Sequence, residues 1–298
     1  MQIITTVRQM QQTCRNLRRK GTIGLVPTMG ALHDGHLSLV RRAQEECDSV
    51  VASIFVNPTQ FAAGEDYETY PRTFDEDCAK LKAAGIDLLF APSQEAMYSP
   101  DSTTFVEVPG IGDRLDGASR PGHFRGVATI VAKLFNVIGP DLAYFGQKDA
   151  AQVAVLRAMI RDLNFPVQLV ACPIVRERDG LAMSSRNRYL SPQNRHRALI
   201  LHRALETVCE LLEAGETRSD ILQDALSGVF AADEGVRLEY ASIVDPRTLL
   251  PVADTAPGAL IAVAAWVGST RLIDNILTEN LPIESLHLHD DFMEETRA

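Results

Sequence analysis

The sequence predicts an α/β protein with a doubly wound, Rossmann-like parallel sheet in its N-terminal domain and a smaller α+β C-terminal domain. In the first half, short β-rich runs alternate with helical patterns, which is typical of a parallel sheet covered by helices. After about residue 175 the order changes to helices followed by a run of strands. A chain of 298 residues has enough material for two cores. We therefore expect one domain over residues 1–175 and a second over residues 176–298.

The strands of the first domain are predicted from short runs rich in apolar and β-branched residues, at 22–27, 49–56, 86–91, 141–145 and 167–172. Helical periodicity between them predicts helices near 36–47, 75–84, 127–138 and 150–163. Gly85 is a stop signal for the second of these helices. Residues 103–109 alternate in a different way between turn residues. They predict an extra strand outside the parallel core, at an edge that would suit dimer contacts.

The second domain begins with two long helical patterns, at 192–213 and 218–230. Three strand-like runs follow, at 238–244, 260–267 and 272–277. Residues 284–298 are polar and acidic, which predicts a loosely ordered tail.

Composition indicates a soluble protein of the cytoplasm. The longest apolar run, at 259–267, is about half as long as a membrane-spanning helix requires. The N-terminus shows no basic stretch followed by an apolar core, so we expect no secretory signal. The cysteines never form a Cys-x-x-Cys pair, which favours reduced thiols over disulfides or a zinc site; they are Cys14, Cys47, Cys78, Cys172 and Cys209.

The net charge of −10 argues against nucleic acid as a partner, because proteins that neutralise phosphates usually display a basic face. The basic cluster at 15–20 lies on a helix-like stretch, where a solvated helix face explains it.

The most informative local pattern runs from Val26 to His36, off the first strand and into the first helix. A doubly wound sheet binds its ligand at such a place, where a helix N-terminus offers free N–H groups to phosphates. His33 and His36 would both face that spot, and Gly30 and Gly35 allow close approach. The pattern is neither a P-loop nor a dinucleotide fingerprint. It resembles the His-x-Gly-His signature of nucleotidyltransferases, although a metal pair or two structural histidines would also fit.

A second pattern lies at Gly146, Gln147, Lys148 and Asp149, where another predicted strand meets a helix. Lys148 would reach a β- or γ-phosphate as a point charge. Asp149 would cap the helix or help to hold Mg²⁺. A capping and surface role for the pair is the simpler alternative.

A third pattern spans residues 179–188 at the proposed domain junction. Ser184, Ser185 and Arg186 would donate hydrogen bonds to a triphosphate. Combined with the His-x-Gly-His signature, this loop resembles the second ATP motif of nucleotidyltransferases. Taken alone, it would be a polar linker.

These patterns and several others occur in the order and spacing of the pantothenate synthetase family. The chain resembles that family from residue 1 to about 280. The segments that carry the resemblance are 27–36 (Pro-Thr-Met-Gly-Ala-Leu-His-Asp-Gly-His), 55–61, 70–73, 120–127, 146–149, 179–188, 264–268 and 271–275.

The resemblance implies a two-step ligase. Pantoate attacks the α-phosphate of ATP, and the amine of β-alanine then attacks the pantoyl adenylate. It also implies Mg²⁺ with ATP, no tightly bound organic cofactor, a cytoplasmic homodimer, and a second domain that acts as a lid.

Site residues follow from the resemblance by position. His36, His33 and Lys148 are the expected catalytic residues, and Gln60 and Gln152 the expected contacts of pantoate and β-alanine, with Asp149 as a contact for magnesium. The expected ATP contacts are Met29, Gly30, Ala31, Leu32, His33, Asp34, Gly35, His36, Gly146, Gln147, Lys148, Asp149, Val175, Met183, Ser184, Ser185 and Arg186.

The sequence departs from the commoner family pattern at Gln147, where Glu is usual, and at Ala150 and Ala151, where an aromatic residue and Gln are usual. Two rival functions stay open on sequence grounds. One is a nucleotidyltransferase that acts on a phosphorylated substrate, although residues 57–61 offer amides and an aromatic ring rather than basic groups. The other is a nucleotide-binding module without catalysis.

Overall fold

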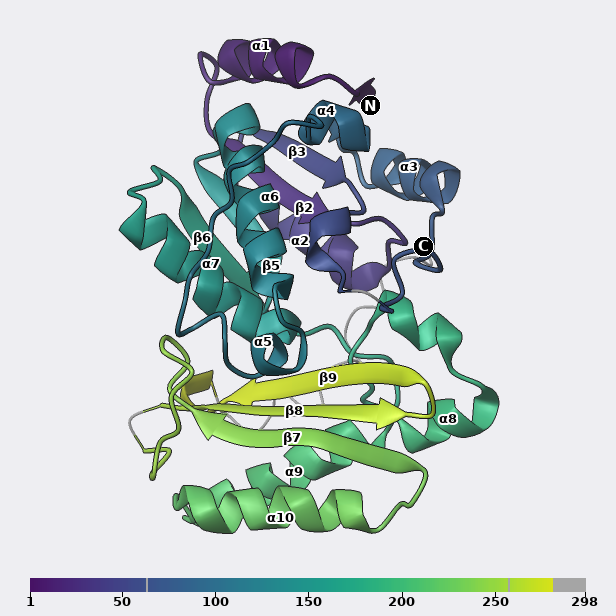
Figure 1. The fold of residues 1–298 in the computed structure, drawn as a ribbon, viewed down its shortest axis with the longest axis vertical. Coiled ribbons are helices and arrows are strands. Elements are labelled where there is room, and N and C mark those ends of the chain that lie inside the picture. Colours follow the sequence, from purple (N-terminus) through teal and green to yellow (C-terminus); the bar gives the residue numbers. More distant parts are fainter. Residues whose placement is uncertain (63, 257, 281–298) are drawn as a thin grey trace, which may run out of the picture. The chain divides into compact units, whose positions relative to one another are not determined.

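The computed structural model describes residues 1–62, 64–256 and 258–280. The chain divides into two compact units, Met1–Val175 and Arg176–Ala298 (Figure 1).

The first unit is built on a six-stranded sheet in the order β1-β4-β3-β2-β5-β6, and every neighbouring pair is parallel. After β2 the chain continues to β3 and β4 on one side, whereas β5 and β6 lie on the other side of β2. This reversal creates a topological switch point beside β2, where open α/β sheets bind ligands. The strands are β1 (Gln2–Ile4), β2 (Ile23–Thr28), β3 (Ser49–Ile54), β4 (Leu88–Phe90), β5 (Leu142–Gly146) and β6 (Gln168–Cys172).

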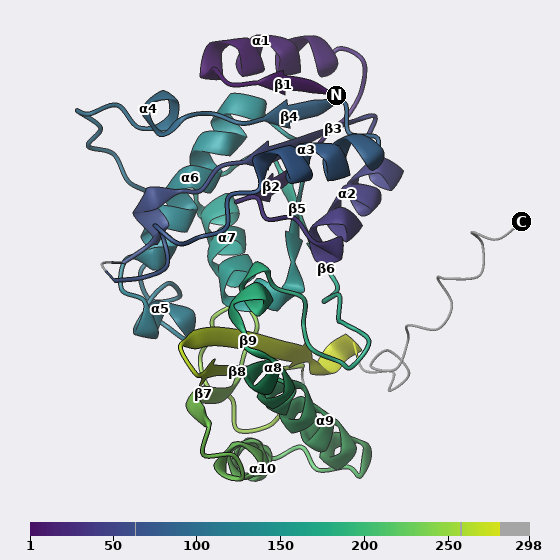
Figure 2. The ribbon, with the colours of Figure 1, turned by 90° about the vertical axis from the view of Figure 1, so that its right-hand side faces the viewer.

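Helices cover both faces of this sheet (Figure 2). On one face, Leu39, Val40 and Ala43 of α2 pack against Val26 of β2 and Ala52 of β3 in a buried cluster. The larger helices are α1 (Val7–Leu17), α2 (Asp34–Glu46), α3 (Phe74–Ala83), α6 (His123–Ile138) and α7 (Ala150–Asp162). The short ones are α4 (Gln94–Met97), α5 (Asp116–Ser119) and the 3-10 turns η1 (Pro58–Gln60) and η2 (Gln147–Asp149).

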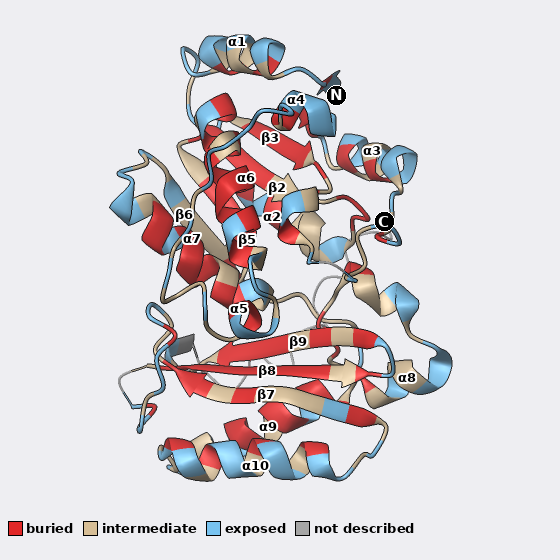
Figure 3. Cartoon of the chain, viewed as in Figure 1, coloured by how far each residue is buried: buried red, intermediate tan, exposed pale blue. Residues whose placement is uncertain are grey.

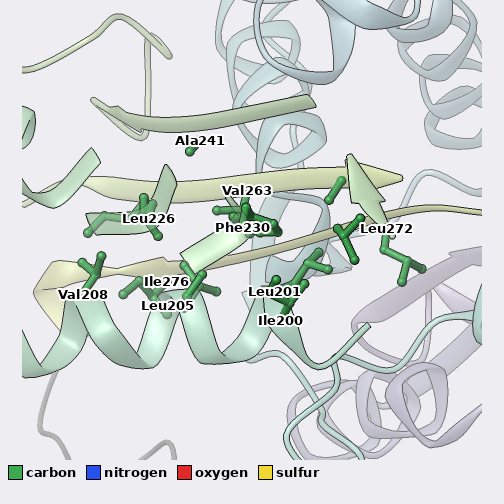
Figure 4. Packing of buried hydrophobic residues seen from close by; sticks show 14 of the residues in the cluster. Ile200, Leu201, Leu205, Val208, Leu226, Phe230, Ala241, Val263, Leu272 and Ile276 are labelled. Atoms are coloured by element: carbon green, nitrogen blue, oxygen red, sulfur yellow. The ribbon is translucent and has the colours of Figure 1, made fainter. Parts of the chain in front are cut away.

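The second unit has an antiparallel sheet in the order β7-β8-β9, with β7 (Val236–Val244), β8 (Leu260–Val267) and β9 (Thr270–Leu277). Leu205 and Val208 of α9 and Leu226 and Phe230 of α10 pack with Val263 of the sheet (Figure 4). β8 is almost entirely buried, β7 and β9 mix buried with more exposed positions, and α10 alternates buried and exposed positions (Figure 3). The helices are α8 (Pro192–Arg197), α9 (Ile200–Glu213), α10 (Ser219–Ala231), η3 (Ser185–Tyr189) and η4 (Thr278–Asn280).

The predicted fold class is confirmed, and two of the predicted elements are wrong. Residues 103–109 form no strand. Instead of joining a ladder, the Val106 N–H donates to the Thr129 hydroxyl at 2.9 Å. The predicted helix at 192–213 is broken between α8 and α9, where the Leu201 N–H bonds to the Ala198 carbonyl in a tighter i, i+3 turn.

Two further outcomes concern the ends of the chain and a possible membrane location. β1 was not predicted, and the predicted tail at 284–298 lies outside the described residues. In the part of the chain that the structure describes, none of the helices has the length and apolar character needed to cross a bilayer.

Candidate active site

The turn after β2 lies at the switch point and leads into α2. Thr28 anchors its start, because the Thr28 hydroxyl donates to the Ser53 carbonyl at 2.7 Å and accepts from the Gly30 N–H at 3.2 Å. Gly30 and Ala31 both have positive φ, at 83° and 51°. This conformation turns the chain back so that α2 begins directly behind the end of the strand.

Two residues of α3 hold this turn. The buried carboxylate of Asp77 accepts the N–H groups of Ala31 at 2.8 Å and of Leu32 at 2.7 Å. The Lys80 ammonium donates to the Leu32 carbonyl at 2.6 Å. Sequence reasoning missed both residues, since they lie more than forty positions away and belong to no recognised motif.

His33 is the N-cap residue of α2 and His36 lies in its first turn, so the two rings are neighbours with centroids 4.1 Å apart. The His33 N–H donates to Nδ1 of His36 at 3.3 Å. An Nδ1 atom that accepts a hydrogen bond leaves the proton of a neutral imidazole on Nε2. His36 therefore presents Nε2–H as a donor.

Both imidazoles are held neutral. Burial, followed by the charges of Lys148 and Lys80, lowers the pKa of His36 to about 4. Burial, His36 and Lys148 lower the pKa of His33 to about 3, against smaller opposing effects of Asp149 and Asp34. At neutral pH the site therefore contains uncharged histidines, with Lys148 as a nearby positive charge. The structure thus brings together His33, His36 and Lys148.

The second predicted segment follows β5 on the other side of the switch point. Gln147, Lys148 and Asp149 form η2, and Asp149 occupies the N-cap position of α7. The exposed Asp149 side chain makes no capping hydrogen bond, so its expected capping role is not observed. A Cβ added to Gly146 would meet no atom within 4 Å, which leaves open space above this strand end.

Gln60 is buried in η1, and its side-chain amide has a fixed orientation. Its Oε1 accepts from Asn57 Nδ2 at 3.1 Å, and its Nε2 approaches the Met29 sulfur at 3.0 Å. The amide oxygen thus accepts one hydrogen bond and the NH₂ group points to the turn after β2. Gln60 and Met29, predicted as contacts of different substrates, are direct neighbours.

The backbone of Gln60 is fixed as well. Its carbonyl accepts from His123 Nδ1 at 2.7 Å and from Arg120 at 3.4 Å, and Arg120 forms an ion pair with Glu65 at 2.6 Å. Burial and then Arg120 lower the pKa of His123 to about 4, so its ring is neutral with the proton on Nδ1. Arg120 and His123 have no role assigned in the sequence analysis, and the structure shows that they support the loop that carries Gln60.

The remaining predicted residues lie in other places. Gln152 is half-buried in the first turn of α7. Val175 ends the first unit. In the second unit, Ser184 accepts the Arg186 N–H at 3.3 Å and starts η3, while Met183 and Arg186 are half-buried and Ser185 is buried.

The described residues contain no group of three or more His, Cys, Asp and Glu side chains placed to hold a metal ion. Asp149 stays the carboxylate that the sequence analysis named for magnesium. Such a site suits a metal that arrives already bound to substrate phosphates, since Mg²⁺ usually keeps several waters and uses one or two carboxylates.

The doubly wound sheet and the two histidines at its switch point define a nucleotide-binding α/β protein of the nucleotidyltransferase type. The sequence narrows this class further, because residues 2–277 match the family described as Pantoate-beta-alanine ligase. The chain belongs to this family. Membership assigns it the activity of a ligase that joins pantoate to β-alanine.

Relatives agree with this assignment over nearly the whole chain. A pantothenate synthetase of Koribacter versatilis is 56% identical over 94% of this chain and 96% of its own. The crystal structure of pantothenate synthetase from Thermus thermophilus has a TM-score of 0.89 at 48% identity, covering 93% of this chain and 99% of that one. A Francisella tularensis pantoate-beta-alanine ligase, complexed with beta-gamma ATP and beta-alanine, has a TM-score of 0.74 at 33% identity, covering 95% and 99%.

Proposed function

We propose that this chain condenses (R)-pantoate with β-alanine through a pantoyl adenylate, releasing diphosphate in the first step and AMP in the second. The observation that carries the proposal is the pair of neutral histidines at the switch point, in a chain that belongs to this ligase family.

In the first step a carboxylate oxygen of pantoate attacks the α-phosphorus of ATP, and the bond to the diphosphate breaks. Negative charge grows on the nonbridging oxygens and on the leaving group. His36 donates a hydrogen bond from Nε2 to this charge, because its Nδ1 is already occupied as an acceptor. A neutral donor of this kind stabilises the transition state without a full proton transfer.

Lys148 acts as a point charge on the β- or γ-phosphate. The second unit supplies Ser184, Ser185 and Arg186 to the triphosphate and serves as a lid. Mg²⁺ enters with ATP, with Asp149 as its candidate protein contact. Gly146 makes room for the nucleotide, which the open space at its Cα supports.

In the second step the amine of β-alanine attacks the acyl carbon of the mixed anhydride, and AMP leaves with the electron pair of the broken C–O bond. The amine loses its proton as the amide forms. A free carboxylate is a poor acyl donor, and this is why the first step is needed.

Gln60 and Gln152 orient pantoate in both steps. Asn57 donates to the Gln60 oxygen and orients the amide, which also offers an NH₂ group that suits a carboxylate.

We also propose a cytoplasmic homodimer with no tightly bound organic cofactor, no nucleic-acid partner and no membrane partner. The family resemblance supports the dimer. Light scattering on the purified chain measures its assembly directly, and a monomeric mass would contradict this part of the proposal.

The function is tested through its half-reactions. Exchange of labelled diphosphate into ATP should require pantoate and no β-alanine, and AMP should accumulate only when both are present. Transfer of AMP to a phosphorylated acceptor, with no exchange dependent on pantoate, would instead favour the rival nucleotidyltransferase. Binding of ATP without either reaction would favour the non-catalytic module.

Replacing Gly146 by Ala should weaken ATP binding without unfolding the protein. Its φ of −77° suits any residue, and the added methyl meets no protein atom. We expect ATP affinity to fall on the order of tenfold, because overpacking by a methyl group costs about 1–3 kcal/mol. Calorimetric titration with ATP measures the effect. Gly228→Ala, at another open position, is the matched control, and equal affinities for ATP would contradict a role for this space.

Replacing Gln60 should affect pantoate and leave ATP nearly unchanged. Gln60→Ala removes a donor to the pantoate carboxylate, and we expect its KM to rise about tenfold, in the range of one charge-assisted hydrogen bond. Gln60→Glu should be worse, because it places a carboxylate against a carboxylate. Steady-state kinetics in both substrates measure this, with Gln12→Ala on α1 as control. An equal rise in the KM for ATP would argue against Gln60 as a contact of pantoate alone.

A further inference from the structure

Asp77 is a buried carboxylate whose oxygens are both used by the turn after β2. It is 1% exposed. Oδ2 accepts from the Ala31 N–H and from the Thr73 hydroxyl at 3.2 Å, and Oδ1 accepts from the Leu32 N–H. Burying a charge is unfavourable unless such hydrogen bonds compensate. The site is therefore built around this carboxylate.

The backbone that Asp77 binds is strained. Ala31 has a left-handed φ of 51°, which a residue with a Cβ adopts only where its surroundings enforce it. Together with Gly30, it directs successive N–H groups to one side and forms a concavity of the kind that binds anions. Asp77 fills that concavity. Ala31 and Leu32 are expected contacts of ATP, and their N–H groups already donate to the protein's own carboxylate.

Lys80 holds the same turn by donating to a backbone carbonyl. It lies three residues after Asp77, on the same face of α3, and donates to the Leu32 carbonyl at 2.6 Å. Side chains of α3 are thus hydrogen-bonded to both the N–H and the carbonyl of Leu32. The next residue, His33, is the N-cap of α2 and is followed three positions later by His36.

We propose that Asp77 and Lys80 are positioning residues for adenylation: by fixing Leu32 they set where His33 and His36 stand relative to the α-phosphate. The inference rests on the proposed function. Neither residue needs to touch the substrate. Displacing a catalytic group by about 1 Å can lower the reaction rate on the order of 10². The hydrogen bonds from Asp77 and Lys80 to the turn therefore control the adenylation rate as well as folding.

A purely structural role would lower stability and leave turnover of the folded protein unchanged. A positioning role predicts a slower first step in protein that stays folded. It also predicts recovery when a small carboxylate refills the concavity. Formate is a suitable probe because it carries the same charged group as the Asp77 side chain.

The decisive comparison is Asp77→Ala against Asp75→Ala, which removes an exposed carboxylate from the same helix. We expect single-turnover formation of pantoyl adenylate to slow on the order of 10² in Asp77→Ala. We expect added formate to restore most of that loss and to leave the wild type unaffected. A rate equal to that of Asp75→Ala, or a loss that formate does not reduce, would overturn the proposal.

Lys80 provides a second test if Asp77→Ala fails to fold. Lys80→Gln keeps a donor for the Leu32 carbonyl, whereas Lys80→Met removes it, and Lys82→Met is the control at an exposed lysine of α3. We expect the first step to slow about tenfold in Lys80→Met, as for loss of one hydrogen bond from a charged donor. The Gln variant should recover part of that rate. Equal rates for Lys80→Met and Lys82→Met would count against a positioning role.

The wild type separates failure of this inference from failure of the proposed function. If the wild type forms no pantoyl adenylate, the proposed function is wrong. The positioning role is then judged by the imidazole NMR signals of His33 and His36. These should shift in Asp77→Ala, and formate should return them. They should also differ between Lys80→Met and Lys80→Gln, which both remove the charge of Lys80 while only the Gln variant keeps a donor for the Leu32 carbonyl. Unmoved signals would contradict the inference whatever the activity.

Discussion

His36→Ala should slow formation of pantoyl adenylate by on the order of 10² to 10³, or roughly 2.7–4 kcal/mol, the usual effect of losing one preorganised donor. The reason is differential binding. Charge on the phosphate oxygens and leaving group increases in the transition state, so the Nε2–H donor contributes more there than to bound ATP. ATP affinity should therefore change little.

Single-turnover quench measurements, made together with a melting curve, distinguish a catalytic role of His36 from a packing role. His36→Gln, which keeps an NH₂ donor, should retain part of the rate that His36→Ala loses. His196→Ala, at an exposed histidine of α8, is the control. A folded His36→Ala protein with wild-type rates would refute the catalytic role, and a loss of stability alone would identify a histidine that only packs the turn.

The parallel sheet was predictable because its strands and helices carry local signals. Buried strands such as β2 and β3 are nearly continuous apolar runs, and α2 shows helical periodicity after the His-x-Gly-His turn. The order of motifs also indicated the family and the reaction, both of which the comparisons confirm. The roles of the individual site residues and the domain roles stay predictions.

Other features could not be predicted because they depend on distant partners. β1 has only three residues and gains its register from β4, more than eighty positions away. The break between α8 and α9 carries no glycine or proline at Ala198 and Leu199. The segment at 103–109 looks like a strand locally, but a strand needs a neighbour, and Thr129 takes its N–H instead.

The electrostatics of the site could not be predicted either, because they also depend on residues that are distant in the sequence. A sequence shows two histidines and a lysine, but the low pKa values of His33 and His36 arise from burial and from charges that folding brings close. The hydrogen bond that fixes the His36 tautomer is likewise a product of the turn. Together these features favour His36 as a neutral hydrogen-bond donor.

Lys148→Met should reduce both ATP binding and the adenylation rate, in contrast to His36→Ala. A lysine that contacts phosphate in the ground state loses affinity when it is removed, and a charged hydrogen bond of about 1.5–3 kcal/mol corresponds to roughly 10- to 100-fold. The rate should fall further, on the order of 10², because charge on the diphosphate also grows in the transition state. Calorimetric titration and single-turnover measurements follow the two effects.

The same substitution has a signature that needs no substrate. The positive charge of Lys148 disfavours protonation of both imidazoles, so its removal should raise the pKa of His36 from about 4 and that of His33 from about 3, toward their ordinary values. Histidine NMR titration of the ligand-free protein measures this, with Lys20→Met, an exposed lysine of the first unit, as control. If both imidazoles titrate as in the wild type while ATP binding is lost, Lys148 lies farther from the histidines than this structure places it. If neither the titration nor ATP binding changes, Lys148 has no role in the site.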